Sequence, residues 1–130
     1  MSTLISNLSK DRMPFGKLFF VTVKEKILGK NYELSLVFCD SLDSKKINKK
    51  HRNKNKPTNV LSFPLNEDVG EIFIDLEKTK LEFRDFNMSY KNFIGYLYIH
   101  GLLHLKGYDH GAEMEKLEKK FVKAFLKINL

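Results

Sequence analysis

The sequence predicts an α+β fold, with residues 1–130 as a single domain built from a sheet of about four strands, flanking helices and a central helix. Three observations predict this class. Four short stretches have the apolar or alternating pattern of strands, and four longer ones have helical spacing. A further stretch that ends near residue 106 is apolar on nearly every side, as expected of a helix buried in a core. A chain of 130 residues, 42% of them hydrophobic, is long enough to bury one continuous core.

The strand predictions rest on short apolar segments with clear ends. Leu4–Leu8 is a short strand, and Tyr32–Cys39 alternates apolar side chains with polar ones. Val60–Phe63 is a third strand, and Pro64 is expected to end it because proline cannot donate to a sheet. Glu71–Asp75 also alternates and gives the fourth strand.

Two helices are predicted in the first half of the chain. Pro14 suits a first helical turn, and apolar residues at helical spacing follow it as far as Gly29. These apolar residues are Phe15, Leu18, Phe19, Val23 and Ile27. Ser41 can cap a short basic helix over Leu42–Arg52.

Three helices are predicted in the second half. A short one spans Leu76–Phe83, and Ser89 can cap the central helix, which runs to Lys106. The last helix spans Ala112–Lys127, with glutamates early and lysines late, as the helix dipole favours. Its buried stripe is expected to consist of Met114, Leu117, Phe121 and Phe125.

The net charge of +7 is concentrated in one segment. Residues 45–66 contain no acidic residue, and their basic residues are Lys45, Lys46, Lys49, Lys50, Arg52, Lys54 and Lys56. Such a patch is typical of a surface that binds a polyanion, where phosphate contacts supply the affinity. A solvated lysine-rich loop is the alternative interpretation.

Other features of the sequence indicate the cellular compartment. Cys39 is the only cysteine, which excludes an intrachain disulfide and favours a reducing compartment. The first residues do not have the pattern of a secretion signal. The longest apolar-rich stretch, Phe93–Leu105, is interrupted by two histidines and is too short for a membrane span. We therefore expect a cytoplasmic protein without a membrane partner.

Three of the four histidines lie between residues 100 and 110. His100 and His104 are four residues apart, so on a helix their rings project from one face. Gly107 can take the left-handed conformation that ends a helix, and the returning chain would bring His110 to the pair. Three neutral imidazoles leave a fourth position open, which is how a catalytic zinc ion is held. A histidine pair alone is often accidental, but the glycine and the third histidine favour a metal site.

The spacing of these histidines is that of the metzincin proteases, HExxHxxGxxH, and it predicts a zincin-like site on the central helix. Those proteases carry a glutamate, the general base, directly after the first histidine. The corresponding residue here is Gly101, and no later segment supplies an obvious substitute. Peptide hydrolysis by that mechanism is therefore disfavoured.

Two longer motifs resemble one known family. Residues 100–110, His-Gly-Leu-Leu-His-Leu-Lys-Gly-Tyr-Asp-His, are similar to the HGxLHLxGYDH signature of the YbeY endoribonucleases, the rRNA maturation factors. Residues 52–64 resemble that family's R-x-x-D-x-P-T-[DN]-V-L-S-F-P, and residues 70–72 its Gly-Asp-[Ile/Leu/Val]. The sequence departs from the family pattern at Asn55, where aspartate is frequent, and at Glu71, which replaces aspartate and keeps the charge.

The resemblance implies a zinc-dependent endoribonuclease, specific for single-stranded RNA, that acts in maturation of the small-subunit rRNA 3′ end and in ribosome quality control. It makes His100, His104 and His110 the ligands of one Zn²⁺ per chain. It makes Arg52 a catalytic residue that faces the metal across a cleft, where its guanidinium has the fork geometry that suits phosphate oxygens. The partners it implies are rRNA and the ribosome or small-subunit ribosomal proteins.

Five further residues lie in or beside these motifs. Asp109 either fixes the tautomer of a ligand histidine or shapes the turn. Ser62 and Thr58 either line the cleft or cap buried backbone groups. Tyr108 is expected to pack rather than to stack on a base, and His51 is expected to be exposed.

Two other functions are alternatives. A metzincin-like metalloprotease is favoured only by the histidine spacing. A non-enzymatic RNA-binding factor of ribosome assembly, with a structural zinc, would have the same sequence features as a slow nuclease.

Overall fold

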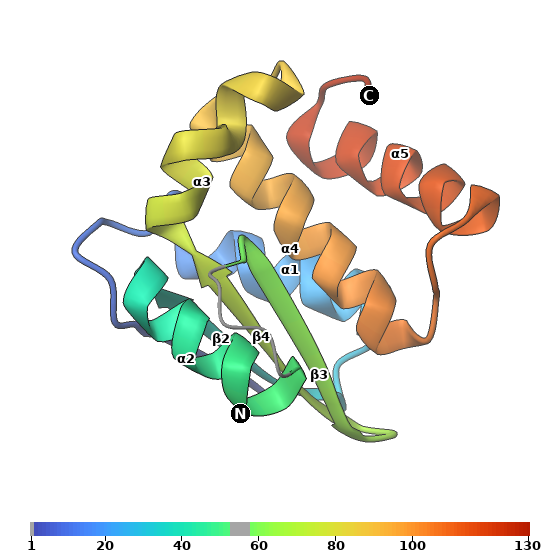
Figure 1. Cartoon of the computed structure of the whole chain (residues 1–130). Coiled ribbons are helices and arrows are strands. Elements are labelled where there is room, and N and C mark those ends of the chain that lie inside the picture. The colour runs from blue at the N-terminus through green and yellow to red at the C-terminus, as the bar shows by residue number, and fades with distance from the viewer. Residues whose placement is uncertain (1, 53–57) are drawn as a thin grey trace.

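Four strands form one mixed sheet in the order β1-β2-β4-β3 (Figure 1). The computed structural model describes residues 2–52 and 58–130. The strands β1 (Thr3–Asn7), β2 (Glu33–Cys39) and β4 (Val69–Asp75) are parallel, and β3 (Val60–Asn66) pairs antiparallel with β4. With the helices that flank this sheet, the predicted α+β class is confirmed.

Helices cover both faces of the sheet. The helices are α1 (Lys17–Leu28), α2 (Ser41–Arg52), α3 (Leu76–Glu82), α4 (Tyr90–Lys106) and α5 (Ala112–Leu126), with a short 3₁₀ turn, η1 (Phe83–Phe86), between α3 and α4. The Ser62 hydroxyl donates to the Gly101 carbonyl of α4, whereas the next side chain, Phe63, contacts His51 of α2. Because successive side chains of a strand point to opposite faces, α4 and α2 lie on opposite sides of β3.

The core lies between the sheet and α4, as the sequence predicts. Leu36 and Phe38 of β2 and Ile72 and Ile74 of β4 are fully buried. Ten of the 17 residues of α4 are buried, which confirms that this helix is enclosed by its neighbours. In Figure 1, α4 and α1 lie on one side of the sheet and α2 on the other, with α5 beside α4. Within the described residues, no helix is long and apolar enough to cross a membrane.

The first helix begins later than predicted. Pro14 lies outside α1, which starts at Lys17 after an extended Gly16. The Phe15 ring, just before this boundary, stacks on Phe19 at 3.9 Å between centroids and meets Phe20 edge-on at 5.7 Å. A hydrophobic contact across the helix start of this kind fixes where the chain enters the helix.

The predicted apolar stripes of α1 and α5 are partly wrong. In α1, Val23 and Ile27 of the predicted stripe are buried, but Leu18 is 78% exposed. The helix also buries Phe20 and Lys24, which the predicted stripe did not include. The Lys24 ammonium is satisfied by the Ser2 hydroxyl and the Lys30 carbonyl. In α5 the buried residues are Met114, Glu118, Phe121 and Val122, while Leu117 and Phe125 are only partly buried.

Two other boundaries also differ from prediction. Ser41 does not precede α2 as its cap but lies in its first turn, where its N–H donates to Glu77. Pro64 does not end β3, which continues to Asn66. The Asp75 N–H donates to the Asn59 carbonyl, so antiparallel alternation turns the backbone of Pro64 toward the free edge, where a missing N–H costs nothing.

Candidate metal centre

The end of α4 brings three histidines together. His100 and His104 lie one turn apart on α4, and Gly107 ends the helix with φ 111° and ψ 5°. The Gly107 N–H donates to the His104 carbonyl, which turns the chain back along the helix. As a result the His110 ring lies 5.3 Å from that of His100 and 5.0 Å from that of His104, between centroids. The sequence predicted this convergence.

The three rings can hold a metal ion. One nitrogen of each lies within 4.8 Å of the other two, and the Nε2 atoms of His100 and His104 are 3.0 Å apart. Two nitrogen ligands of a tetrahedral zinc ion, each at about 2.05 Å, are separated by roughly 3.3 Å. The observed separation is close to this value, so small ring rotations suffice to place both atoms around one cation.

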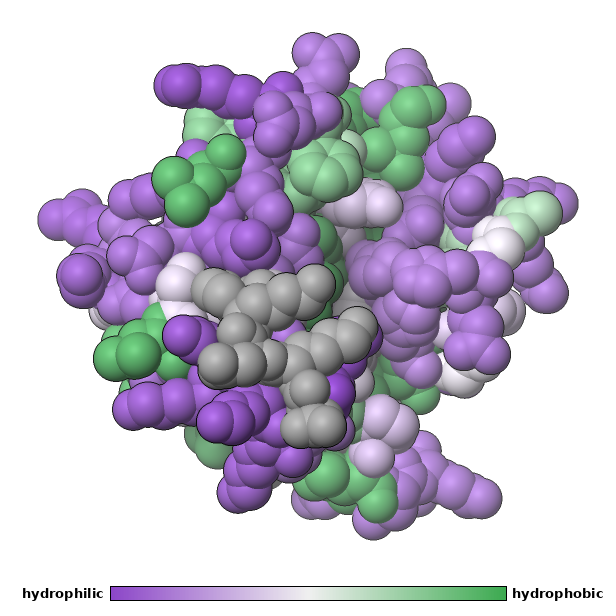
Figure 2. Space-filling model, viewed as in Figure 1, coloured by the Kyte–Doolittle hydropathy of each residue, from purple (hydrophilic) through white to green (hydrophobic). Residues whose placement is uncertain are grey.

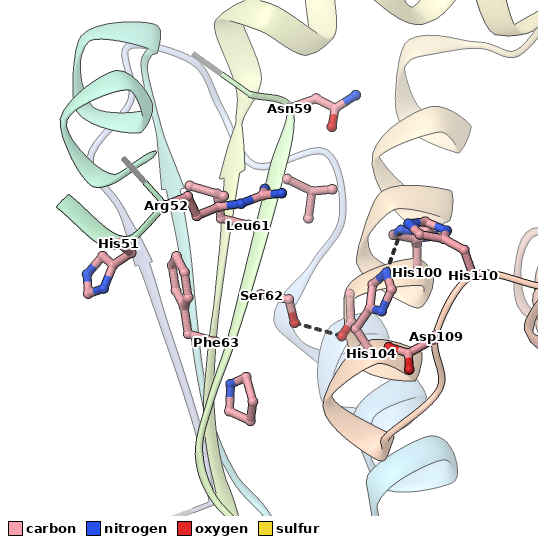
Figure 3. Close-up of a pocket in the computed structure, with 13 residues that line it drawn as sticks. His51, Arg52, Asn59, Leu61, Ser62, Phe63, His100, His104, Asp109 and His110 are labelled. Carbon is pink, nitrogen blue, oxygen red and sulfur yellow. Dashed lines mark hydrogen bonds between the residues drawn. The ribbon is translucent and has the colours of Figure 1, made fainter. Parts of the chain in front are cut away.

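Two hydrogen bonds fix the tautomers of the helical pair. The Nδ1 atom of His100 is 2.6 Å from a carboxylate oxygen of Glu118 on α5, and the Nδ1 atom of His104 is 2.9 Å from the Tyr108 carbonyl. Both acceptors draw the ring proton to Nδ1, which leaves lone pairs on the two Nε2 atoms. The 3.0 Å contact between these two atoms is a hydrogen bond only if one of them carries a proton (Figure 3). With both protons on Nδ1 the lone pairs face each other, and a cation between them would remove the repulsion.

Burial also favours the neutral form of His104. It lowers the pKa of His104, and the neighbouring His100 lowers it further. A neutral imidazole is the form that binds a metal ion.

Glu118 is the residue of this candidate centre that sequence reasoning missed. Asp109 lines the cleft, but among the described hydrogen bonds none joins it to a histidine. Glu118 is only 6% exposed and takes the role considered for Asp109. The predicted packing of the Tyr108 side chain is confirmed, since it lies partly buried against the core.

A cleft of about 660 Å³ separates the histidines from Arg52 (Figure 3). Its walls come from the C-terminal end of α2, the edge strand β3, and the end of α4 with the loop that follows. Arg52 extends from the last turn of α2 toward the histidine side in Figure 3. His51 is exposed, as predicted, and its ring contacts Phe63 at 4.6 Å between centroids. His51 and Phe63 line the same cleft as Arg52.

Of Ser62 and Thr58, which were both expected either to line the cleft or to cap buried backbone groups, only Ser62 lines the cleft. Ser62 lines the cleft, and its hydroxyl also donates to the Gly101 carbonyl at 3.0 Å, which joins β3 to α4 next to His100. Thr58 is half-buried and is not among the described residues that line the cleft.

Gly101 lies where α4 packs closely against β4. A Cβ atom at this position would lie 3.1 Å from Cδ1 of Ile72 in β4, closer than ordinary contact. A glutamate there would be pressed against the sheet. The close approach of α4 to β4 therefore supports the prediction that the protease mechanism is disfavoured.

The basic segment covers the exposed surface of α2. Lys45, Lys46, Lys49, Lys50 and Arg52 are all exposed, and the surface over this helix is largely hydrophilic in Figure 2. Lys54, Asn55 and Lys56, which were also named from the sequence, lie outside the described residues. The five described basic side chains therefore extend from the cleft along the neighbouring surface.

Comparison with known proteins identifies the family. The profile of the family described as "Endoribonuclease YbeY" matches residues 8–126. The chain belongs to this family. The YbeY family is a family of endoribonucleases, enzymes that hydrolyse RNA, so the resemblance of the two motifs is confirmed at the level of the family.

Individual relatives agree with this assignment. The chain is 33% identical over 122 residues to "Endoribonuclease YbeY" of Borreliella afzelii, a match that spans 85% of this chain and 80% of that protein. It is 39% identical over 89 residues to the protein of the same name from Acholeplasma laidlawii, a match that spans 65% of each. A solution structure from Thermotoga maritima superposes with a TM-score of 0.65 at 30% identity and covers 95% of this chain and 90% of that one.

Proposed function

We propose that residues 1–130 form a zinc-dependent hydrolase domain that cuts single-stranded RNA internally. The observation that carries this proposal is the convergence of His100, His104 and His110 on one side of a cleft that Arg52 lines on the other. Family membership supplies the class of reaction, and the geometry supplies the residues that would perform it.

The three histidines are the proposed metal ligands. They are all nitrogen donors, a set that suits zinc and leaves one coordination position for water or substrate. When bound, the ion would polarise a phosphoryl oxygen or lower the pKa of a water molecule to about 7. Glu118 and the Tyr108 carbonyl hold the helical pair in the ligating tautomer.

Arg52 is the proposed catalytic residue. Its guanidinium can donate two parallel hydrogen bonds to phosphate oxygens and stays charged at any working pH. From the opposite wall of the cleft it would hold the scissile phosphate and stabilise the charge that grows on its oxygens. The exposed lysines of α2 would bind the phosphates that continue the strand.

The biological substrate in this proposal is rRNA. Maturation of the small-subunit rRNA 3′ end, ribosome quality control and contact with small-subunit ribosomal proteins are proposed from the resemblance of the motifs. The basic surface of α2 supports a polyanionic partner of this kind. The cytoplasmic location stays a prediction from the sequence.

Cleavage assays on purified protein test this function. The parent should hold about one zinc ion per chain and cut labelled single-stranded RNA. His110→Ala should lose both zinc and cleavage, whereas Arg52→Ala should keep zinc and lose roughly a hundredfold or more in cleavage rate. Arg12→Ala, at another exposed arginine, is the matched control and should cleave like the parent. Zinc binding and cleavage at parental levels in His110→Ala would contradict the proposal.

A further inference from the structure

A second hollow lies beside the metal centre. It has a volume of about 400 Å³ and shares His100 and His110 with the cleft that Arg52 lines. The remaining wall is largely apolar and comes from η1, the turn that follows it, α4 and α5, with side chains that include Phe86, Met88, Tyr96 and Met114. Figure 2 shows apolar surface in this region, between the α3 and α5 sides of the molecule. The two shared histidines make the hollow continuous with the metal centre.

Phe86 offers an aromatic face at this hollow. The residue is 48% exposed, although its side chain is large and apolar. On one side it stacks against the fully buried Phe93, with centroids 4.5 Å apart and planes 22° from parallel. The backbone beside it is held by Asn87, which is left-handed and donates its N–H to Arg84. The ring is therefore a fixed, half-open platform rather than a loose side chain.

We propose that this hollow binds one nucleobase of the RNA, that of a nucleotide joined to the phosphate at the metal centre. The inference rests on the proposed function, because it assumes that the scissile phosphate of the RNA lies between the three histidines and Arg52. Proteins that bind single-stranded RNA hold unstacked bases against aromatic side chains, and each such contact is sequence-tolerant. Phe86 supplies the platform, and the exposed side chains of Glu115 and Lys119 at the rim can reach the edges of the base.

This subsite gives a physical reason for single-strand specificity. A base can enter the hollow only after it leaves its stack and its pairing partner. In a duplex that step costs free energy, and in a single strand most of the cost is absent. The hollow would thus select the RNA form, while the metal centre and Arg52 act on its phosphate.

Dinucleotides with a single base removed test the inference. Their one phosphodiester fixes the register, so binding of ApA to the zinc-loaded Arg52→Ala protein can be compared with binding of its two abasic versions by NMR titration. We expect one abasic version to bind roughly tenfold more weakly, the usual loss for one base–aromatic contact. In the additional Phe86→Ala variant, ApA should bind as weakly as that abasic version, and Phe86→Tyr should restore the difference. Leu81→Ala, at a side chain 80% exposed on α3, should keep the difference.

The result separates this inference from the proposed function. Equal binding of ApA and both abasic versions, or a difference that Phe86→Ala leaves unchanged, would overturn the base subsite. These outcomes leave any RNA cleavage by the parent unaffected. Conversely, a Phe86-dependent difference in a protein that cuts no RNA would support the subsite and contradict the nuclease.

Discussion

Glu118 connects α5 to the candidate metal centre through a hydrogen bond to His100. Its carboxylate lies 2.6 Å from Nδ1 of His100, and the side chain is almost fully buried. Burial raises the pKa of Tyr96, the charges of Glu118 and Glu115 raise it further, and the protonated Tyr96 hydroxyl is hydrogen-bonded to Glu118. The carboxylate thus accepts from two sides and holds the His100 ring in one orientation.

Replacing Glu118 should weaken metal binding without removing a ligand. Glu118→Gln keeps the size of the side chain but loses the charge that draws the proton to Nδ1, so we expect zinc affinity to fall by roughly 10- to 100-fold. Competition with a chromophoric chelator measures this change. Glu113→Gln, at an exposed glutamate of the same helix, is the control and should bind zinc like the parent. Equal affinities in both variants would show that the carboxylate does not support the site.

The residues of the centre differ in how far the sequence predicts them. The spacing of His100, His104 and His110, with Gly107 between, predicts their convergence because helix geometry and one left-handed turn determine it. Glu118 is 18 residues from His100, and only the packing of α5 on α4 brings them together. Asp109 adjoins His110 in sequence, but a short sequence separation does not decide which carboxylate reaches a ring.

The position of α2 relative to the cleft gives its lysines different roles. Ser44 and Asn48 form its buried side. Lys45, Lys49 and Arg52 follow at spacings of four and three residues, so they share one flank of the helix, and Arg52 lines the cleft. The other exposed pair, Lys46 and Lys50, lies on the side opposite the buried residues.

Neutralising the two lysine pairs should therefore have unequal effects. Lys45→Gln with Lys49→Gln should weaken binding of single-stranded RNA more than Lys46→Gln with Lys50→Gln, although both double variants lose the same charge. The slope of log affinity against log salt concentration should fall by about 0.7 for each phosphate contact removed in the first variant. Fluorescence anisotropy at several salt concentrations measures both effects. Identical losses in the two variants would indicate that α2 acts only through its net charge.

The periodicity of apolar residues predicts which helices and strands are present better than it predicts where each one begins and ends. The helices and strands named from the sequence are present, but α1 begins after Pro14 because Phe15 packs on Phe19 and Phe20. β3 continues through Pro64 because it is an edge strand of the sheet. Which strand lies at the edge depends on the order of all four strands. Neither reason can be read from a local pattern, since each depends on which neighbour a residue meets.

The whole molecule has a core that is complete without the metal centre. Phe20, Leu36, Ile72 and Tyr98 are fully buried in one cluster that includes residues of the sheet, α1, α4 and α5. The histidines lie at the rim of this cluster, two on α4 and the third, His110, on the exposed loop that follows. A bound ion would therefore join that loop to a helix that the core already holds in place.

Removal of the metal should abolish cleavage and leave the fold intact, because the core does not depend on the ligands. After chelation we expect an unchanged far-UV circular dichroism spectrum, and a melting temperature that rises when zinc is added back, since the ion binds only the folded chain. Limited proteolysis should show new cleavage confined to residues 107–111. The alternative of a ribosome-assembly factor with a structural zinc predicts instead that the metal-free chain unfolds, and that zinc-loaded protein binds RNA without cutting it. A cooperative loss of the circular dichroism signal on chelation would thus favour that alternative, and a folded but inactive metal-free protein favours the nuclease.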